Sequence, residues 1–360
     1  SHLFVVLPWV FLLSVVTARP MGGCNRGIKC TNFTANNLTF QCRTAGPSPS
    51  TSTTNVLLLH GFPEFSEMYS DLMRTLAGLN YSSIACNQRG YSLDAPLSVD
   101  DYLYPLLEQD AWAVAARHFG VHATFHLIGH DHGALLGWCM SASNPNRLLS
   151  SYTALSVPHT DAFSQGIYGA HADLEQQIAS QYFTMFTEKK SASSHFEFWW
   201  LTLGKFDGNT DSANIWTSAK DFQKALWWYN GAMDAGVMAT PPIMSASQIL
   251  SHGLSHAAIA ALRTLWGGTP NNGSNATKPI GDIENVPVLY VCGSKDSAIL
   301  CNRPYALKTK NYIKNGTYQN VVVNCGHDLL ACADKSETAK VVASIISHLQ
   351  TNGDNKRSEY

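Results

Sequence analysis

The residue best suited by type and setting to carry out chemistry is an aspartate enclosed by glycines in a short turn. Asp131 lies at the centre of Gly-His-Asp-His-Gly (129–133), after an apolar stretch from Phe125 and before a helical stretch that ends near Ser143. A strand-to-helix turn this tight needs glycines on both sides, and it forces the central side chain outward. A carboxylate held there can attack carbon to form an ester, which water must then hydrolyse. The alternative interpretation is an ordinary helix N-cap, a position in which Asp is common.

An acid and a base that could serve such an ester follow apolar stretches near the end of the chain. Asp296 comes after the stretch 286–291, and His327 comes after the stretch 320–323. We predict that His327, oriented by Asp296, removes a proton from the attacking water. Asp161 is the alternative acid. The alternative interpretation is that Asp296 is an ordinary turn residue and that His327 is a surface or core histidine without a catalytic role.

A fourth polar turn follows the apolar stretch 56–59 and reads His-Gly-Phe-Pro. We predict that the backbone N–H groups of Phe62 and His132 form an oxyanion hole for the charge that develops during ester hydrolysis. We also expect His60, Pro63 and Trp228 to bind substrate.

The elements that must position these residues alternate between short apolar strands and amphipathic helices. This alternation predicts an α/β fold with a mostly parallel sheet, in which ligands bind at the carboxyl ends of the strands. From 159 to 285 helical and aromatic patterns replace the strand signals. We therefore predict a leader (1–18), a core in two segments (19–158 and 286–350), an inserted helical cap (159–285) and a flexible tail (351–360).

The motifs together resemble the epoxide hydrolase branch of the α/β-hydrolase superfamily. The matching text is His-Gly-Phe-Pro-Glu (60–64), Asn-Gln-Arg-Gly-Tyr-Ser (87–92), Gly-His-Asp-His-Gly-Ala (129–134), Val-Pro-Val-Leu-Tyr-Val-Cys-Gly-Ser-Lys-Asp (286–296) and Cys-Gly-His (325–327). The resemblance implies an α/β-hydrolase fold, a mostly parallel central sheet with an inserted helical cap. It also implies a small apolar epoxide as substrate, a vicinal diol as product and no cofactor.

The family uses two cap tyrosines to hold and protonate the epoxide oxygen, and the resemblance assigns these roles to Tyr182 and Tyr229. Neutral phenol hydroxyls suit this task because their ordinary pKa is about 10. The chain departs from the family pattern at His132, where Trp is usual, and at Ser156, where Asn is common. A Met/His/Ala-rich stretch at 235–263 also makes the cap longer than is usual.

Two other functions fit the same motifs. A haloalkane or haloacid dehalogenase shares the Asp nucleophile. However, Phe62 and His132 stand where a haloalkane dehalogenase has its halide-binding Asn and Trp, and no Arg follows the nucleophile. A secreted, non-catalytic binding protein for apolar ligands is the second alternative, and the complete set of Asp131, Asp296 and His327 argues against it.

Composition indicates a secretory protein without a nucleic-acid partner. The net charge is −2, and the chain has 9 Cys, which fits an oxidising compartment. An apolar run that ends in a small-residue site after Ala18 predicts a cleaved signal peptide, so we expect no membrane association afterwards. Glycosylation motifs begin at Asn32, Asn37, Asn80, Asn272, Asn275 and Asn315.

The cysteines allow several pairings, and their spacing predicts no metal site. Cys30 with Cys42, Cys292 with Cys301, and Cys325 with Cys332 could each close a short segment. Cys24 has no evident partner. Cys86 and Cys139 lie in apolar stretches and are predicted to be buried thiols. The oligomeric state is not predicted.

Overall fold

The computed structural model describes residues 24–49, 54–92, 94–169, 172–187, 219–234, 236–239 and 279–353. Several features predicted from sequence lie outside these residues. They are the leader 1–18, the glycosylation motifs at Asn272 and Asn275, almost all of the stretch 235–263, and the last seven residues of the chain.

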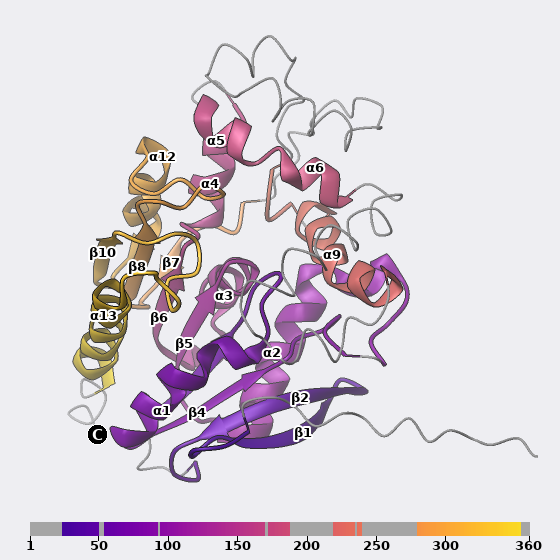
Figure 1. Ribbon diagram of the computed structural model, residues 1–360, viewed down its shortest axis with the longest axis vertical. Helices are drawn as coiled ribbons and strands as arrows, with labels where there is room; N and C mark the ends of the chain where they lie inside the picture. Colours follow the sequence, from indigo (N-terminus) through magenta and orange to yellow (C-terminus); the bar gives the residue numbers. More distant parts are fainter. Residues whose placement is uncertain are drawn as a thin grey trace, which may run out of the picture.

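The core is an eight-stranded sheet with the order β1-β2-β4-β3-β5-β6-β8-β10 (Figure 1). β1 and β2 pair antiparallel, as do β2 and β4, and all other neighbours are parallel. The mostly parallel sheet that the sequence predicts is therefore confirmed. Its strands are β1 (Lys29–Ala35), β2 (Leu38–Ala45), β3 (Thr54–Leu59), β4 (Tyr81–Cys86), β5 (Phe125–His130), β6 (Leu149–Leu155), β8 (Val288–Gly293) and β10 (Tyr318–Val323).

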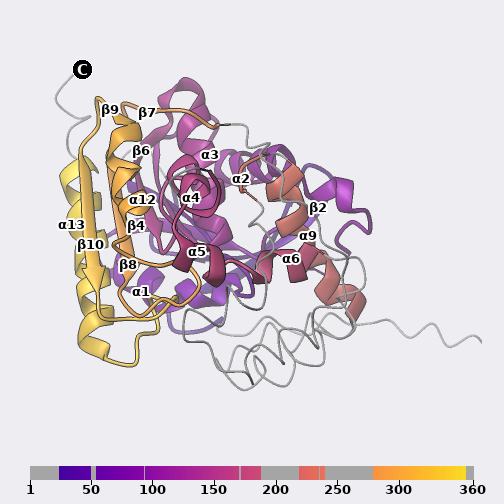
Figure 2. The ribbon, with the colours of Figure 1, turned by 90° about the horizontal axis from the view of Figure 1, so that it is seen from above.

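Helices cover both faces of the sheet because its strands are apolar on both faces. In β3, Leu57 and Leu59 pack into one apolar cluster, and Val56 and Leu58 pack into the other, as alternation along a strand requires. α2 (Tyr104–Phe119) and α3 (His132–Ser143) cover the first face, and α1 (Ser70–Gly78) and α13 (Lys335–Gly353) cover the second. In Figure 2, α13 runs along β8 and β10 at one border of the molecule. α13 also continues three residues into the predicted tail.

A helical segment is inserted between β6 and β8. Its described helices are α4 (Thr160–Ile167), α5 (Leu174–Ala179), α6 (Tyr182–Thr187) and α9 (Ala219–Asp234). Figure 1 shows them on one side of the sheet, with α6 beside α9. The expectation that 159–285 holds no strand is wrong at its end. There, β7 (Ile283–Glu284) pairs with β9 (Ile313–Lys314). Each of these strands has only two residues, which is too short to leave an apolar pattern in the sequence.

Short helical turns complete the connections between the larger elements. They are α12 (Pro304–Leu307) and the 3₁₀ turns η1 (Ser66–Tyr69), η2 (Val99–Tyr102), η3 (Pro145–Arg147) and η4 (Lys308–Tyr312).

Four disulfides link the described cysteines, and Cys139 is a buried free thiol. Cys292–Cys301 and Cys325–Cys332 agree with the pairings considered from sequence. The pairing of Cys30 with Cys42 and the free thiol at Cys86 are both wrong. Cys42 lies directly opposite Cys86 across β2 and β4 and bonds to it, whereas Cys30 bonds to Cys24. Strand register, which spacing along the chain does not reveal, decides these partners.

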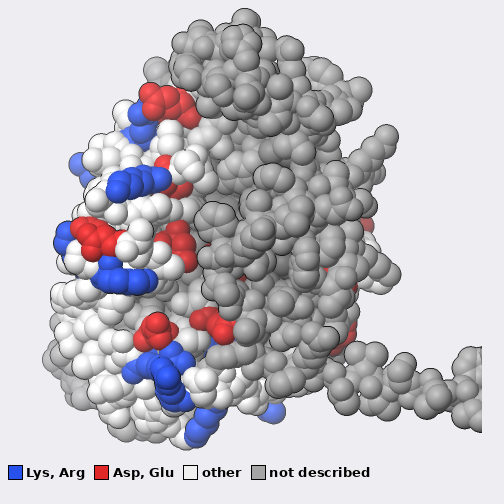
Figure 3. Space-filling model, in the orientation of Figure 1, with Lys and Arg blue, Asp and Glu red and all other residues white. Residues whose placement is uncertain are grey.

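The visible described surface carries lysine, arginine and acidic side chains that are interspersed (Figure 3). The four described asparagines of glycosylation motifs, at 32, 37, 80 and 315, are all exposed. Within the described ranges, each helix is too short or too polar to cross a bilayer.

Candidate active site

Asp131 occupies the sharp turn between β5 and α3. Its backbone has a φ of 52° and a ψ of −121°, a conformation that non-glycine residues rarely adopt. Neighbouring glycines allow the close packing that holds it there. A Cβ on Gly133 would lie 2.0 Å from the carbonyl oxygen of Leu59, and one on Gly61 would lie 2.3 Å from the Cβ of Asp131. Steric contact therefore explains the glycines at positions 133 and 61.

The Asp131 carboxylate contacts a different group through each oxygen. Oδ1 accepts a hydrogen bond of 2.8 Å from the backbone N–H of Phe62, and Oδ2 lies 3.2 Å from Nε2 of His327. His132 is the first residue of α3, so its N–H is among the unpaired donors of the helix N-terminus. Phe62, on the loop after β3, and His132, the next residue in the chain, are therefore both neighbours of Asp131.

The His327 imidazole bridges Asp131 and the carboxylate of Asp296. Its Nδ1 lies 2.6 Å from Oδ2 of Asp296, whose other oxygen accepts the N–H groups of Ala298 and Ile299 at 2.8 and 3.0 Å. Asp296 is therefore fixed by its own loop and in turn fixes the orientation of the ring. The alternative acid Asp161 instead accepts hydrogen bonds from the backbone at 280 and 281.

The environment sets opposite pKa shifts on Asp131 and His327. Burial opposes ionisation of Asp131, but its hydrogen bond with His327 and the nearby imidazoles outweigh burial and lower the pKa of the carboxyl. Burial likewise opposes protonation of His327, but the charge of Asp296 and the hydrogen bonds with both carboxylates raise its pKa well above the ordinary value. Both shifts share one cause, because the contact between Asp131 and His327 favours the charged form of each group.

Two side chains that the sequence did not single out as functional hold the backbone of His327. The His327 carbonyl oxygen accepts a hydrogen bond of 2.6 Å from the hydroxyl of Ser156 and lies 3.1 Å from Nε2 of His130. Ser156 was noted only as a departure from the family pattern. Its φ of 72° is unusual for serine and turns it toward His327.

The two predicted cap tyrosines lie over the Asp131 turn. The ring centroid of Tyr229 is 4.3 Å from that of His132 and 5.5 Å from that of Phe62, and Tyr182 is 6.1 Å from Tyr229. Burial first, and the charge of Asp131 with it, raises the pKa of both phenols. Both hydroxyls are therefore neutral donors across the ordinary pH range.

His60 and Trp228 lie behind the Phe62 loop and not on an open surface. The rings stack at 5.7 Å, and both side chains are buried. His60 accepts the N–H of Gln88 on Nε2, and the Trp228 indole N–H donates to the carbonyl of Arg89. Their polar atoms are used within the protein, so their positions favour support of the loop over the direct substrate contact predicted from sequence. Pro63 is half-buried.

His132 has a partner that sequence patterns did not suggest. Its Nδ1 lies 2.7 Å from the hydroxyl of Tyr104, the first residue of α2. Burial lowers the pKa of His132 despite the charge of Asp131, so the ring is neutral. No group of three or more potential metal ligands occurs among the residues that the structure describes.

Comparison with known proteins identifies the architecture. Residues 54–179 match the family model for the alpha/beta hydrolase fold. The AB hydrolase superfamily protein YfhM of Bacillus subtilis is 26% identical over 299 residues, which cover 81% of this chain and 88% of that protein. Epoxide hydrolase 3 of Siraitia grosvenorii is 32% identical over 123 residues, but these are 33% of this chain and 38% of that protein.

Solved structures agree on the fold. One described as "Novel epoxide hydrolases belonging to the alpha/beta hydrolases superfamily in metagenomes from hot environments" gives a TM-score of 0.63 at 20% identity and covers 89% of this chain and 99% of its own. The Bacillus megaterium epoxide hydrolase in complex with an inhibitor gives 0.58 at 16% identity, over 89% and 100%. The chain therefore has the α/β-hydrolase fold, with an inserted helical region, as predicted. Among its distant relatives are proteins named epoxide hydrolases.

Proposed function

We propose that this protein is an epoxide hydrolase that converts a small apolar epoxide to a vicinal diol through an ester on Asp131. One observation carries the proposal. The Asp131 carboxylate, at the turn between β5 and α3, meets His327 through one oxygen and the Phe62 N–H through the other, near the buried Tyr229 and the partly buried Tyr182. An attacking group, a base and hydrogen-bond donors thus converge on one carboxylate.

Ring opening needs an ionised nucleophile and an acid for the departing oxygen. The lowered pKa of Asp131 keeps it ionised. One carboxylate oxygen attacks an epoxide carbon, the C–O bond of the ring breaks, and the oxygen receives a hydrogen bond and then a proton from Tyr182 or Tyr229. General acid assistance of this kind contributes about 10²–10⁴-fold to a rate.

Hydrolysis of the ester needs His327 as a neutral base. Ester formation removes the charge of Asp131, and with it one of the causes that raise the pKa of His327. The first step therefore favours the form of the imidazole that the second step requires. His327 accepts a proton from water, the hydroxide adds to the ester carbonyl, and the Phe62 and His132 N–H groups stabilise the oxyanion. Collapse breaks the ester C–O bond, and the departing oxygen of the diol takes the proton from His327. The proton of the new Asp131 carboxylic acid returns to the tyrosinate left by ring opening, which restores the carboxylate.

Trapping of the ester tests this mechanism. His327→Gln should accumulate, on incubation with styrene oxide, a protein whose mass is increased by one epoxide molecule. Asp131→Asn should form no such adduct, and Asp161→Asn serves as the matched control that turns over normally. An unchanged mass of the His327→Gln protein contradicts the proposal. Halide release from a haloalkane without diol formation would assign the nucleophile to dehalogenation instead.

The tyrosines are tested separately. Tyr182→Phe and Tyr229→Phe should each slow adduct formation in the His327→Gln background, and the double variant should slow it by about 10²-fold or more. Adduct formation at the full rate in the double variant would show that another group, such as His132, holds the epoxide oxygen.

We further propose that residues 159–285 form a cap above the core. We also propose that the protein acts in the secretory pathway or outside the cell. The exposed asparagines of four glycosylation motifs and the four disulfides support the compartment. Expression in a secreting eukaryotic cell should yield a glycoprotein whose mass falls on treatment with an N-glycosidase. Accumulation in the cytosol without glycans would contradict this proposal.

A further inference from the structure

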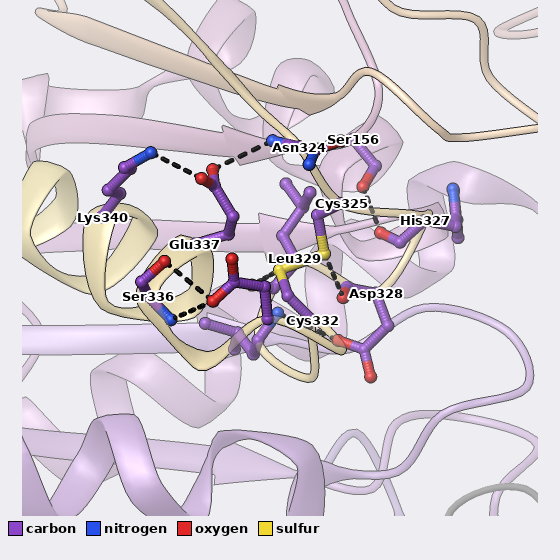
Figure 4. The surroundings of a disulfide bond; sticks show 12 residues. Ser156, Asn324, Cys325, His327, Asp328, Leu329, Cys332, Ser336, Glu337 and Lys340 are labelled. Atoms are coloured by element: carbon purple, nitrogen blue, oxygen red, sulfur yellow. Dashed lines mark hydrogen bonds and ion pairs between the residues drawn. A yellow bond between two sulfur atoms is a disulfide. The ribbon is translucent and has the colours of Figure 1, made fainter.

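The acid and the base of the site each lie inside a small loop closed by a disulfide. Cys292–Cys301, nine residues apart, encloses Asp296, and Cys325–Cys332, seven residues apart, encloses His327. Figure 4 shows the second disulfide with His327 to its right. Asp131 has no such enclosure.

These loops follow the last two strands of the sheet, and the His327 loop leaves the edge strand itself. β8 and β10 are the last two strands, and β10 pairs with β8 alone among the described strands. β5, which carries Asp131, instead pairs with β3 on one side and β6 on the other. Between β10 and α13 the backbone forms turns and bends without a helix or strand. A segment of this kind has more conformational freedom than a strand-to-helix turn.

The two loops contact each other directly. The N–H of Lys295 donates to the carbonyl of Cys325 at 2.9 Å, and a Cβ on Gly293 would lie 2.3 Å from the carbonyl oxygen of Gly326. Val323 and Gly293 are register partners at the ends of β10 and β8. A displacement of either loop therefore changes the distance between Asp296 and His327.

The Cys325–Cys332 disulfide also anchors its loop in the core. Both cysteines and Leu329 between them are buried in the apolar cluster under α13. The N–H of Asn324 donates to the carboxylate of Glu337, at the start of α13, at 3.0 Å. The disulfide thus joins the two ends of the His327 loop at a buried point, where the loop cannot shift without opening the core (Figure 4).

We propose that the disulfides Cys325–Cys332 and Cys292–Cys301 are positioning elements for the hydrolytic half of the reaction. The inference rests on the function proposed above. Ring opening uses the cap tyrosines and the Asp131 carboxylate, which one oxygen keeps tied to the Phe62 N–H on a different loop from that of His327. Hydrolysis uses Nε2 of His327 on water and Nδ1 on Asp296. Loss of these disulfides therefore leaves ester formation intact and slows ester hydrolysis.

The experiment compares three double variants of the full chain: Cys325→Ser with Cys332→Ser, Cys292→Ser with Cys301→Ser, and, as the matched control, Cys24→Ser with Cys30→Ser. Intact mass during and after mixing with styrene oxide gives the rates at which the ester forms and decays. In the first two variants formation should stay near the wild-type rate. Decay should slow by at least about tenfold, since a misplacement of 1 Å can cost about 100-fold. The control should match the wild type in both rates.

Equal loss of both rates, or unchanged decay, would overturn the inference. If a variant does not fold, mild reduction of the native enzyme is the second measurement. Thiol labelling then identifies molecules with an open Cys325–Cys332 bond, and unchanged ester decay in them again overturns the inference. His327→Gln separates the two proposals. An adduct in that variant with normal decay in the cysteine variants rejects the positioning role alone, whereas no adduct in any variant rejects the proposed function.

Discussion

The turn that carries Asp131 and the paired loops that carry Asp296 and His327 are positioned by different physical means. The turn lies at the centre of the sheet, where Gly133 packs against the Leu59 carbonyl and no Cβ can be added. The loops follow the last two strands of the sheet and are held by disulfides and by hydrogen bonds from other segments. Close packing fixes the attacking group, and separate ties fix the groups that serve it.

This difference teaches where each region tolerates change. A packed turn responds to any added volume because its neighbours are backbone atoms that cannot move independently. A tied loop tolerates added volume where a residue such as Gly326 faces open space, but it depends on each tie. The predictions below test that contrast from the largest effect to the smallest.

Glycine substitutions should separate the two regions most strongly. Gly133→Ala should reduce the free energy of unfolding by at least about 3 kcal/mol, because the new Cβ meets the Leu59 carbonyl. Gly326→Ala, next to His327, should cost less than about 1 kcal/mol, because a Cβ there meets no heavy atom within 4 Å. Denaturant unfolding of both variants measures the difference, and similar losses would remove the contrast.

The charge of Asp131 should control the protonation of His327. Asp131→Asn should lower the pKa of His327, because one of the carboxylates that raise it becomes neutral. As the pH rises, the imidazolium of the variant then loses its proton at a lower pH than in the wild type. In the wild type it keeps its proton well above the ordinary pKa of about 6.5. NMR of labelled histidine follows the titration, with Asp161→Asn as the control. An equal or higher pKa in Asp131→Asn would show that the two groups are not coupled.

Gln176 on α5 ties the inserted helices to the Asp296 loop. Its buried side chain accepts the N–H of Leu300 and donates to the carbonyl of Ala298, both at 2.8 Å. Gln176→Ala should cost about 1–3 kcal/mol, because it leaves buried polar groups unpaired, and it should slow ester decay. Gln165→Ala, which removes an exposed glutamine from neighbouring α4, should change stability by less than about 0.5 kcal/mol. Equal thermal stability of the two variants would contradict this role.

The outer ion pairs beside the same loop should matter least. Arg303 pairs with Asp173 and Glu175 at 2.7 and 2.9 Å and is partly exposed. Arg303→Ala should cost less than about 1 kcal/mol, and the cost should shrink further at high salt. Unfolding at two ionic strengths measures it, and a large loss that does not depend on salt would point to a buried structural role.

Much of the fold was predictable because it depends on local patterns. Apolar runs such as 56–59 and 125–128 predict buried parallel strands, and Gly129 and Gly133 around Asp131 predict the tight turn. The order of Asp131, Asp296 and His327 along the chain suggested that strand ends bring them together, and the structure places His327 between the two carboxylates. Their catalytic roles remain a proposal.

The sequence by itself therefore determined most of the larger elements and the polar residues that end them, because periodicity and turn chemistry act over a few neighbouring residues. Only the tertiary structure decided that Cys42 meets Cys86, that Tyr104 contacts His132, and that Ser156 holds the His327 carbonyl. These contacts join residues 28 to 171 positions apart, so they depend on strand register and helix packing, which no local pattern records.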